Sequence, residues 1–120
     1  MKLRKKRIYE EPEPNDGVRV LIDRLWPRGV SKERAAIDFW ARDLSPSTEL
    51  RRWYGHAPAR WEAFQERYFE EIDSNPDALH ALRDALNPNG QNTIVFASKE
   101  PKLNNATALI LYLERNPASG

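Results

Sequence analysis

A chain of 120 residues with a net charge of +1 and no cysteine excludes several classes of protein. The length suits one domain and is too short for two. Without cysteine there are no disulfides, no thiolate chemistry and no cysteine-ligated zinc or iron site, a composition that fits a reducing compartment. Opposite charges nearly cancel, so no large basic field attracts nucleic acid.

The N-terminal segment carries a run of basic residues, namely Lys2, Arg4, Lys5, Lys6 and Arg7. No apolar signal-peptide core follows this run. The apolar stretch 106–113 is far shorter than the roughly 20 residues that a membrane span needs. We therefore expect a cytoplasmic protein with no membrane partner. The acidic segment after the basic run favours a solvated start of the chain over a nucleic-acid contact.

Two strands are predicted in the first quarter of the chain. Residues 5–9 predict a short edge strand. Residues 18–23 (VRVLID) predict a strand buried on both faces, because their apolar residues are nearly continuous. Between them, residues 10–17 (EEPEPNDG) contain two prolines and an Asn-Asp-Gly turn signal, which exclude regular structure.

Capping residues predict two short helices next. Ser31 is placed to cap a helix over residues 32–43. Ser47 or Thr48 is placed to cap a further helical turn, which Gly55 ends.

The second half predicts two helices, a strand and a last helix. After Pro58, one apolar face is spaced for an amphipathic helix, and it consists of Trp61, Phe64, Tyr68 and Ile72. Asn75 is placed to cap the next helix, which has proline at its first position. Residues 93–98 (TIVFAS) predict a second buried strand, and Asn104 is placed to cap the final helix.

Buried strands separated by helices predict an α/β fold: one small domain with a short, mainly parallel sheet and helices on its faces. We expect one domain over residues 1–120, with an ordered core over about 5–115 and a frayed tail at 116–120.

Polar residues follow both buried strands. The first strand leads to Asp23, Arg24, Arg28 and Ser31, and the second leads to Ser98, Lys99, Asn104 and Asn105. In an open parallel sheet, ligands bind beyond the carboxyl ends of the strands. Arginine forks and helix N-termini both favour phosphate or carboxylate. If the strands are parallel neighbours, these residues predict a site for a small anion.

Each of these residues also has a structural interpretation. Asp23 and Arg24 can pair with neighbours and pin the loop, and Arg28 can brace the chain around Pro27. Trp26 is better explained by packing than by stacking on a ligand. The residues alone leave the two interpretations open.

A second cluster runs from Arg51 to His56 (RRWYGH). His56 is the better of the two histidines for proton transfer, because the ordinary pKa of histidine lies near neutrality. With Asp23 it forms the pair of candidate catalytic residues. The structural alternative is a histidine bonded to backbone, and the sequence leaves open whether this cluster joins the strand-end crevice.

Several chemistries have no signature in the chain. Two histidines without nearby carboxylate spacing give no metal motif. There is no glycine-rich phosphate loop, no Gly-x-Ser-x-Gly and no dinucleotide fingerprint. We therefore expect neither a metal nor a cofactor.

Four stretches together resemble a known family: 16–29 (DGVRVLIDRLWPRG), 31–32 (SK), 46–50 (PSTEL) and 53–56 (WYGH). They are similar to the domain-of-unknown-function 488 (DUF488) family, in its YeaO-like branch, over residues 6–113. The resemblance implies a small bacterial cytosolic α/β protein and supplies no function. In the wider family a strand ends in Asp, with an Arg, a Pro and a Ser behind it, which Asp23, Arg24, Pro27 and Ser31 resemble.

One position departs from the family pattern. Relatives tend to carry Asn-His-Ala at the start of the last helix, where this chain has Asn104-Asn105-Ala106. Asparagine cannot act as a general base. Either that histidine is not catalytic in the family, or this member has lost an activity.

Three functions remain in competition. The first is binding of a small phosphate- or carboxylate-bearing ligand, held by Arg24, Arg28 and Lys99. The second is a hydrolase or transferase in the same crevice, with Asp23 or His56 moving the proton. The third is an interaction module for nucleic acid or a protein partner, motivated by the basic run and the aromatics. Ligand identity, catalysis and oligomeric state are left open.

Overall fold

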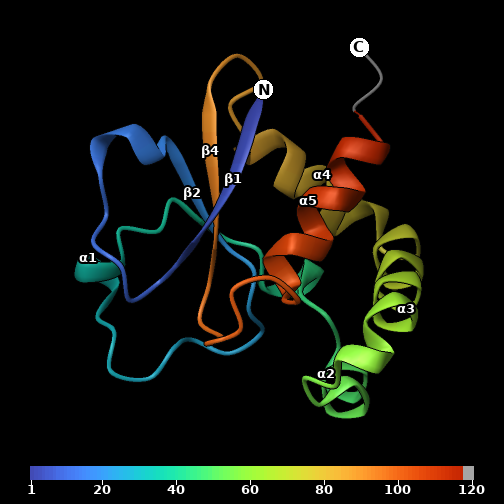
Figure 1. Cartoon of the computed structure of the whole chain (residues 1–120). Helices are drawn as coiled ribbons and strands as arrows, with labels where there is room; N and C mark the ends of the chain where they lie inside the picture. Colours follow the sequence, from blue (N-terminus) through green and yellow to red (C-terminus); the bar gives the residue numbers. More distant parts are fainter. Residues whose placement is uncertain (118–120) are drawn as a thin grey trace.

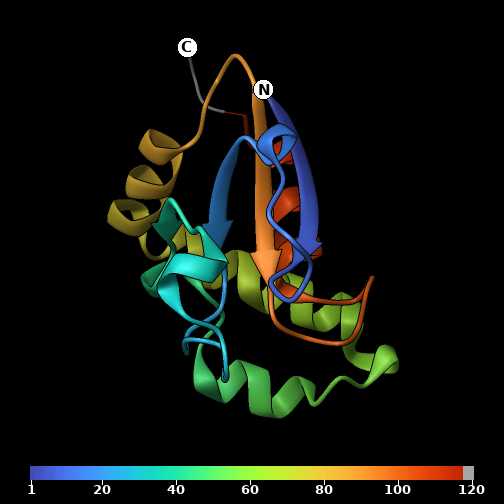
Figure 2. The same ribbon diagram turned by 90° about the vertical axis from the view of Figure 1, so that its left-hand side faces the viewer.

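The structure, a computed structural model, describes residues 1–117. Within them, four parallel strands form one sheet in the order β1-β4-β2-β3. The strands are β1 (Lys2–Arg7), β2 (Val18–Leu21), β3 (Phe39–Trp40) and β4 (Gln91–Phe96). Because they run parallel, their carboxyl ends meet at one edge of the sheet, and in Figure 2 the arrowheads of β1, β2 and β4 all point the same way. The predicted parallel α/β fold is confirmed.

Helices cover the two faces of the sheet unequally (Figure 1). One face carries most of the helical layer: α2 (Thr48–Tyr54), α3 (Trp61–Asp73), α4 (Pro76–Ala85) and α5 (Asn105–Arg115). The other face is covered by the short α1 (Lys32–Ala35) and by the 3₁₀ turn η1 (Pro14–Asp16). Two further 3₁₀ turns, η2 (Arg42–Leu44) and η3 (Pro58–Arg60), lead into α2 and α3.

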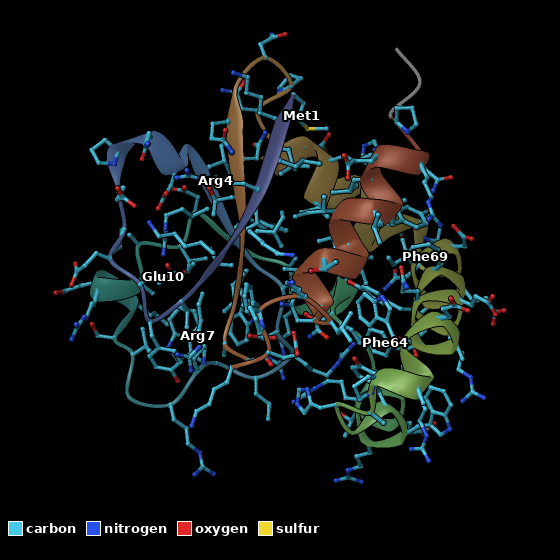
Figure 3. The ribbon with its side chains drawn as sticks, viewed as in Figure 1. Met1, Arg4, Arg7, Glu10, Phe64 and Phe69 are labelled. Carbon is cyan, nitrogen blue, oxygen red and sulfur yellow. The ribbon has the colours of Figure 1, made fainter. Side chains whose placement is uncertain are left out.

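The main core lies between the sheet and the large helical layer. The aromatic rings of Phe64 and Tyr68 are fully buried there, against strand residues such as Val20 and Ile94. Figure 3 shows Phe64 among the side chains of this layer. The predicted apolar face of the third helix is thus the face that packs on the sheet.

The opposite face of the sheet is apolar at one end and charged at the other. At its carboxyl end a smaller apolar cluster contains Leu21, Ala35 and Val95. At its amino end a charged group gathers around Asp16. Parallel pairing places Arg4, Thr93 and Arg19 in one row across β1, β4 and β2, so their side chains share this face.

The Asp16 cluster (Arg4, Lys6, Asp16 and Arg19) binds η1 to the sheet. The carboxylate of Asp16 is fully buried and accepts hydrogen bonds from Arg19 Nη1 (2.7 Å), Lys6 Nζ (3.3 Å) and Arg4. Burial acts to raise the pKa of this carboxyl, but the hydrogen bonds from the backbone of Glu13 and from the three cations outweigh it and lower the pKa to about 2. At the amino end of this sheet face, ion pairs and hydrogen bonds of the Asp16 cluster thus take the place of an apolar core.

Three helices begin directly after the N-cap residues that the sequence indicates. The Ser47 hydroxyl accepts the Leu50 N–H at the start of α2, and the Asn75 side chain accepts the Ala78 N–H at the start of α4. Asn104 accepts the Thr107 N–H (3.0 Å) at the start of α5. These three predicted helix starts are confirmed.

The predicted helix over residues 32–43 is wrong beyond its first turn. It ends at Ala36, which adopts a left-handed conformation with φ of 49°. The chain then becomes extended, because Asp38 exchanges hydrogen bonds with the backbone of Arg19 and leads into β3. Pairing with β2 is therefore stronger here than local helix preference.

Other boundaries also differ from the prediction. β1 begins at Lys2, three residues before the predicted edge strand, and β2 ends at Leu21 rather than at Asp23. The predicted frayed tail lies partly outside the described residues, at 118–120. Within residues 1–117, no helix is both long enough and apolar enough to cross a membrane.

Candidate functional site

A cleft of about 610 Å³ opens at the carboxyl ends of β2 and β4. Four segments line it. They are Tyr9 after β1, Asp23 and residues 25–28 after β2, five side chains of α2 and the turn after it (Thr48, Arg51, Arg52, Tyr54 and His56), and residues 97–98 and 103–105 after β4. The two clusters that the sequence left separate therefore share one cleft. Its volume lies within the range of about 300–1,000 Å³ that is common for small-molecule sites.

Asp23 lies in this cleft and connects three elements. Its Oδ2 accepts the Ala97 N–H at 2.8 Å, and its Oδ1 accepts from Nδ2 of Asn105 at 3.2 Å. Its backbone oxygen accepts from Nε1 of Trp40 at 2.6 Å. Burial raises the pKa of the Asp23 carboxyl, opposed by the Ala97 hydrogen bond, by the charge of Arg51 and by Asn105. Both carboxylate oxygens thus serve the fold.

The start of α5 contributes two asparagines with different roles. Asn104 is buried and fully engaged, because its Oδ1 caps the helix and its Nδ2 donates to the Glu100 carbonyl at 2.7 Å. Asn105 lines the cleft and donates to Asp23 and to the Ile22 carbonyl at 3.3 Å. Asn105 therefore contacts the only carboxylate that lines the cleft within residues 1–117.

The loop between β4 and α5 is held by its own contacts. Arg7 Nε donates to the carbonyls of Ala97 (3.2 Å) and Ser98 (3.1 Å). The Glu100 carboxylate accepts the N–H groups of Leu103 (2.9 Å) and Lys102, and these two bonds lower its pKa. This side of the cleft is consequently well braced.

Local conformation at the end of α2 sets the direction of its cleft-lining residues. Gly55 (φ 53°) and His56 (φ 56°) are both left-handed, which turns the chain sharply after the helix. Tyr54 is buried, and its hydroxyl donates to the Leu103 carbonyl at 2.9 Å, linking α2 to the loop before α5. Burial, followed by the charge of Glu100, raises the pKa of the Tyr54 hydroxyl. His56 itself is exposed at the cleft.

The lining of the cleft is strongly cationic. Arg28, Arg51 and Arg52 line it and are exposed. Within residues 1–117, none of the three guanidiniums forms an ion pair. Against these three cations the lining holds one carboxylate, Asp23. The excess positive charge makes the cleft electrostatically suited to an anion.

The structure brings five of the predicted ligand-binding residues to the cleft: Asp23, Arg28, Ser98, Asn104 and Asn105. It does not bring Arg24, Ser31 or Lys99 there. Arg24 turns away and donates to the carbonyls of Ser45 (2.7 Å) and Pro46 (3.3 Å), which is the structural alternative raised above. Ser31 caps α1, and Lys99 is exposed outside the lining.

Some lining residues were not predicted as binding residues. Arg51 and Arg52 belong to the second cluster, and only the tertiary arrangement joins them to the first. Tyr9 and Leu25 gave no signal, because an aromatic or apolar residue in a loop is usually packed. Trp26 packs as expected: its indole N–H donates to the Val30 carbonyl at 2.6 Å, and its ring meets that of Trp40 edge-on at 5.4 Å.

In the part of the chain that the structure describes, no group of three or more histidine, cysteine or acidic side chains is placed to hold a metal ion.

The fold and the cleft define a small parallel α/β protein with a cationic site beyond its strand ends. The sequence matches, over residues 2–119, the family described as the inactive DUF488-N3 subclade. The chain therefore belongs to the DUF488 family, as the resemblance implied.

Relatives agree with this assignment. The chain is 34% identical to the uncharacterised protein YeaO of Escherichia coli K12, over 94% of this chain and 97% of that protein. It is 45% identical to uncharacterised proteins of Mycobacterium tuberculosis and Mycobacterium bovis, over 68% of this chain and 69% of theirs. No solved structure matches the chain significantly.

Proposed function

We propose that this protein binds a small phosphate- or carboxylate-bearing molecule in the cleft and does not turn it over. The observation that carries the proposal is the set of three cleft arginines, Arg28, Arg51 and Arg52, whose guanidiniums form no ion pair within residues 1–117.

Arginine is the residue best suited to this role. Its planar guanidinium carries a permanent charge and donates pairs of parallel hydrogen bonds to phosphate or carboxylate. Arg51 and Arg52 stand on α2, a helix anchored at both ends: its cap residue Ser47 binds Glu71 at 2.6 Å, and Tyr54 binds the Leu103 carbonyl. Two cations on an anchored helix lose less freedom when a ligand binds than two on a loose loop.

Binding without turnover is supported by the state of the candidate catalytic residues. Asp23 accepts one hydrogen bond on each carboxylate oxygen, from Ala97 and from Asn105, so the fold and not a substrate sets the orientation of its carboxylate. Asn105, the cleft side chain that donates to Asp23, is an amide, and an amide cannot exchange protons near neutral pH. The description of the matched family as an inactive subclade supports the same conclusion.

Nucleic-acid binding by the basic N-terminal run has less support. Arg4 and Lys6 are engaged with Asp16, Lys5 donates to the Thr107 hydroxyl at 2.8 Å, and Arg7 binds loop carbonyls. These cations stabilise the fold, which leaves few of them for phosphates of a nucleic acid.

Calorimetric titration with inorganic phosphate at low salt tests the proposal. Each of Arg51→Gln and Arg52→Gln is expected to weaken binding about tenfold or more, because a hydrogen bond to a charged group contributes about 1.5–3 kcal/mol. Arg115→Gln is the matched control: it removes the same charge at the opposite end of α5 and should leave the affinity unchanged.

The proposal fails if phosphate and simple carboxylates do not bind, or if all three variants bind phosphate equally. Urea unfolding of each variant shows that a lost affinity is not a lost fold. Turnover of phosphoesters by the purified protein, abolished by Asp23→Asn, would support the enzyme alternative instead.

A further inference from the structure

Two unusually exposed apolar side chains stand at the cleft. Within residues 1–117 the exposed large hydrophobic residues are Met1, Tyr9 and Leu25, and the last two line the cleft, with 46% and 67% of their surfaces exposed. A single exposed apolar residue needs no explanation. Here two of the three exposed large hydrophobic residues lie at the same cationic cleft, beside the half-buried Trp26. Together they form an apolar wall, which does need an explanation.

Two members of this apolar wall (Tyr9, Leu25 and Trp26) are held in place by contacts within the protein. The Tyr9 hydroxyl donates to the Arg28 carbonyl at 3.2 Å, and the Arg7 guanidinium lies 4.5 Å from the centre of the Tyr9 ring. Trp26 is fixed by its bond to the Val30 carbonyl. Tyr9 and Trp26 are therefore already ordered while their apolar surface faces water. A ligand that covers this surface loses little further affinity to side-chain ordering.

The wall and the α2 cations come from different segments of the cleft lining. Figure 1 shows the loop after β2 running toward α1, and α2 on the side of the large helical layer. A phosphate or carboxylate group alone fills only a small part of about 610 Å³. An anion at Arg51 and Arg52 would thus leave the apolar wall uncovered.

We propose that the ligand of this cleft is one molecule that carries both an anionic group and a planar apolar ring, with the anion at Arg51 and Arg52 and the ring on the Tyr9–Leu25–Trp26 wall. This inference rests on the proposed anion site and specifies its ligand class. A planar ring suits the wall because aromatic side chains and a flat ring exclude water over a large area at low entropic cost. The anionic group is a phosphate or a carboxylate.

Two pairs of simple compounds separate the two parts of the proposal. Methyl phosphate and phenyl phosphate carry the same dianion at pH 8 and differ in the ring, and acetate and benzoate form the corresponding carboxylate pair. Calorimetric titration of the full chain with all four compounds is expected to show the ring-bearing member of at least one pair binding about tenfold tighter or more. The pair that shows it identifies the anionic group.

Variants assign the preference to the wall. Leu25→Ser and Tyr9→Ser replace exposed side chains, and each should reduce the preference for the ring, measured as the ratio of the two affinities within a pair, at least threefold. Leu25→Met keeps an apolar side chain and should keep the preference. Arg51→Gln should weaken both members of a pair equally.

The outcomes distinguish the two claims. Equal binding of both members in both pairs overturns the ring wall and leaves the anion site standing. Absence of binding by all four compounds overturns the anion site and the ring wall together. A ring preference that Leu25→Ser and Tyr9→Ser leave unchanged also overturns this placement of the ring.

Discussion

Replacing Asp23 by asparagine distinguishes a cleft that only binds an anion from a cleft that catalyses a reaction. Asp23 is the one carboxylate among the described residues that line the cleft, so it repels any bound anion. For an anion about 8 Å away and an effective dielectric constant of about 20–40, this repulsion is about 1–2 kcal/mol. Asp23→Asn should therefore bind phosphate about 5- to 30-fold more tightly than the natural chain.

The same substitution has opposing effects on stability. Asparagine can accept only one of the hydrogen bonds that Ala97 and Asn105 now donate, a loss of about 1–3 kcal/mol. Burial raises the pKa of Asp23, so its ionised form destabilises the fold above the ordinary pKa, and removing the charge recovers part of the loss. We expect a net destabilisation of about 1–2 kcal/mol.

Titration calorimetry with phosphate and urea unfolding measure both effects. Glu66→Gln is the control, since it removes one negative charge from an exposed position on α3 that does not line the cleft. It should change phosphate affinity less than twofold. A weaker affinity in Asp23→Asn would refute the electrostatic reasoning and would show that the carboxylate itself contacts the ligand.

Three further predictions concern the fold. The pKa of Asp16 is lowered from 3.8 to about 2, so it contributes about 2 kcal/mol of stability that is fully present above about pH 5. This stability should be lost progressively as the pH falls from there through 2, as seen by urea unfolding at a series of pH values, and a flat profile in this window contradicts the cluster. Gly17→Ala should cost about 2–4 kcal/mol, because φ is +66° and a Cβ would lie 2.0 Å from the Gln91 carbonyl oxygen, and an unchanged Tm would exclude this close approach. Phe64→Ala should cost about 3–5 kcal/mol in the same unfolding assay, and a cost below 1 kcal/mol would show that the site collapses or is hydrated.

Local chemistry made most of the fold predictable. Ser47, Asn75 and Asn104 mark helix starts because a short polar side chain can accept an otherwise unpaired N–H. The residues after Ala36 were unpredictable for the opposite reason. Their extended course depends on the backbone of Arg19, a partner distant in sequence, and no local signal reports such pairing.

The site was half predictable. The rule that ligands bind beyond parallel strand ends located the cleft at Asp23 and Asn105. It could not give side-chain direction: Arg24 follows Asp23 directly, yet it turns from the cleft and donates to the Ser45 carbonyl, a partner distant in sequence. The contribution of Arg51 and Arg52 required the packing of α2 beside the strand ends, which many distant contacts determine.

The most direct test of the anion site is a titration of the isotope-labelled protein with inorganic phosphate, followed by the backbone amide resonances in NMR spectra. Binding in the cleft predicts saturable shifts concentrated at Arg28, Arg51, Arg52 and Asn105, with little change around Asp16 on the far part of the sheet. Shifts centred on the basic N-terminal strand, or no saturable shift at any amide, would contradict the account.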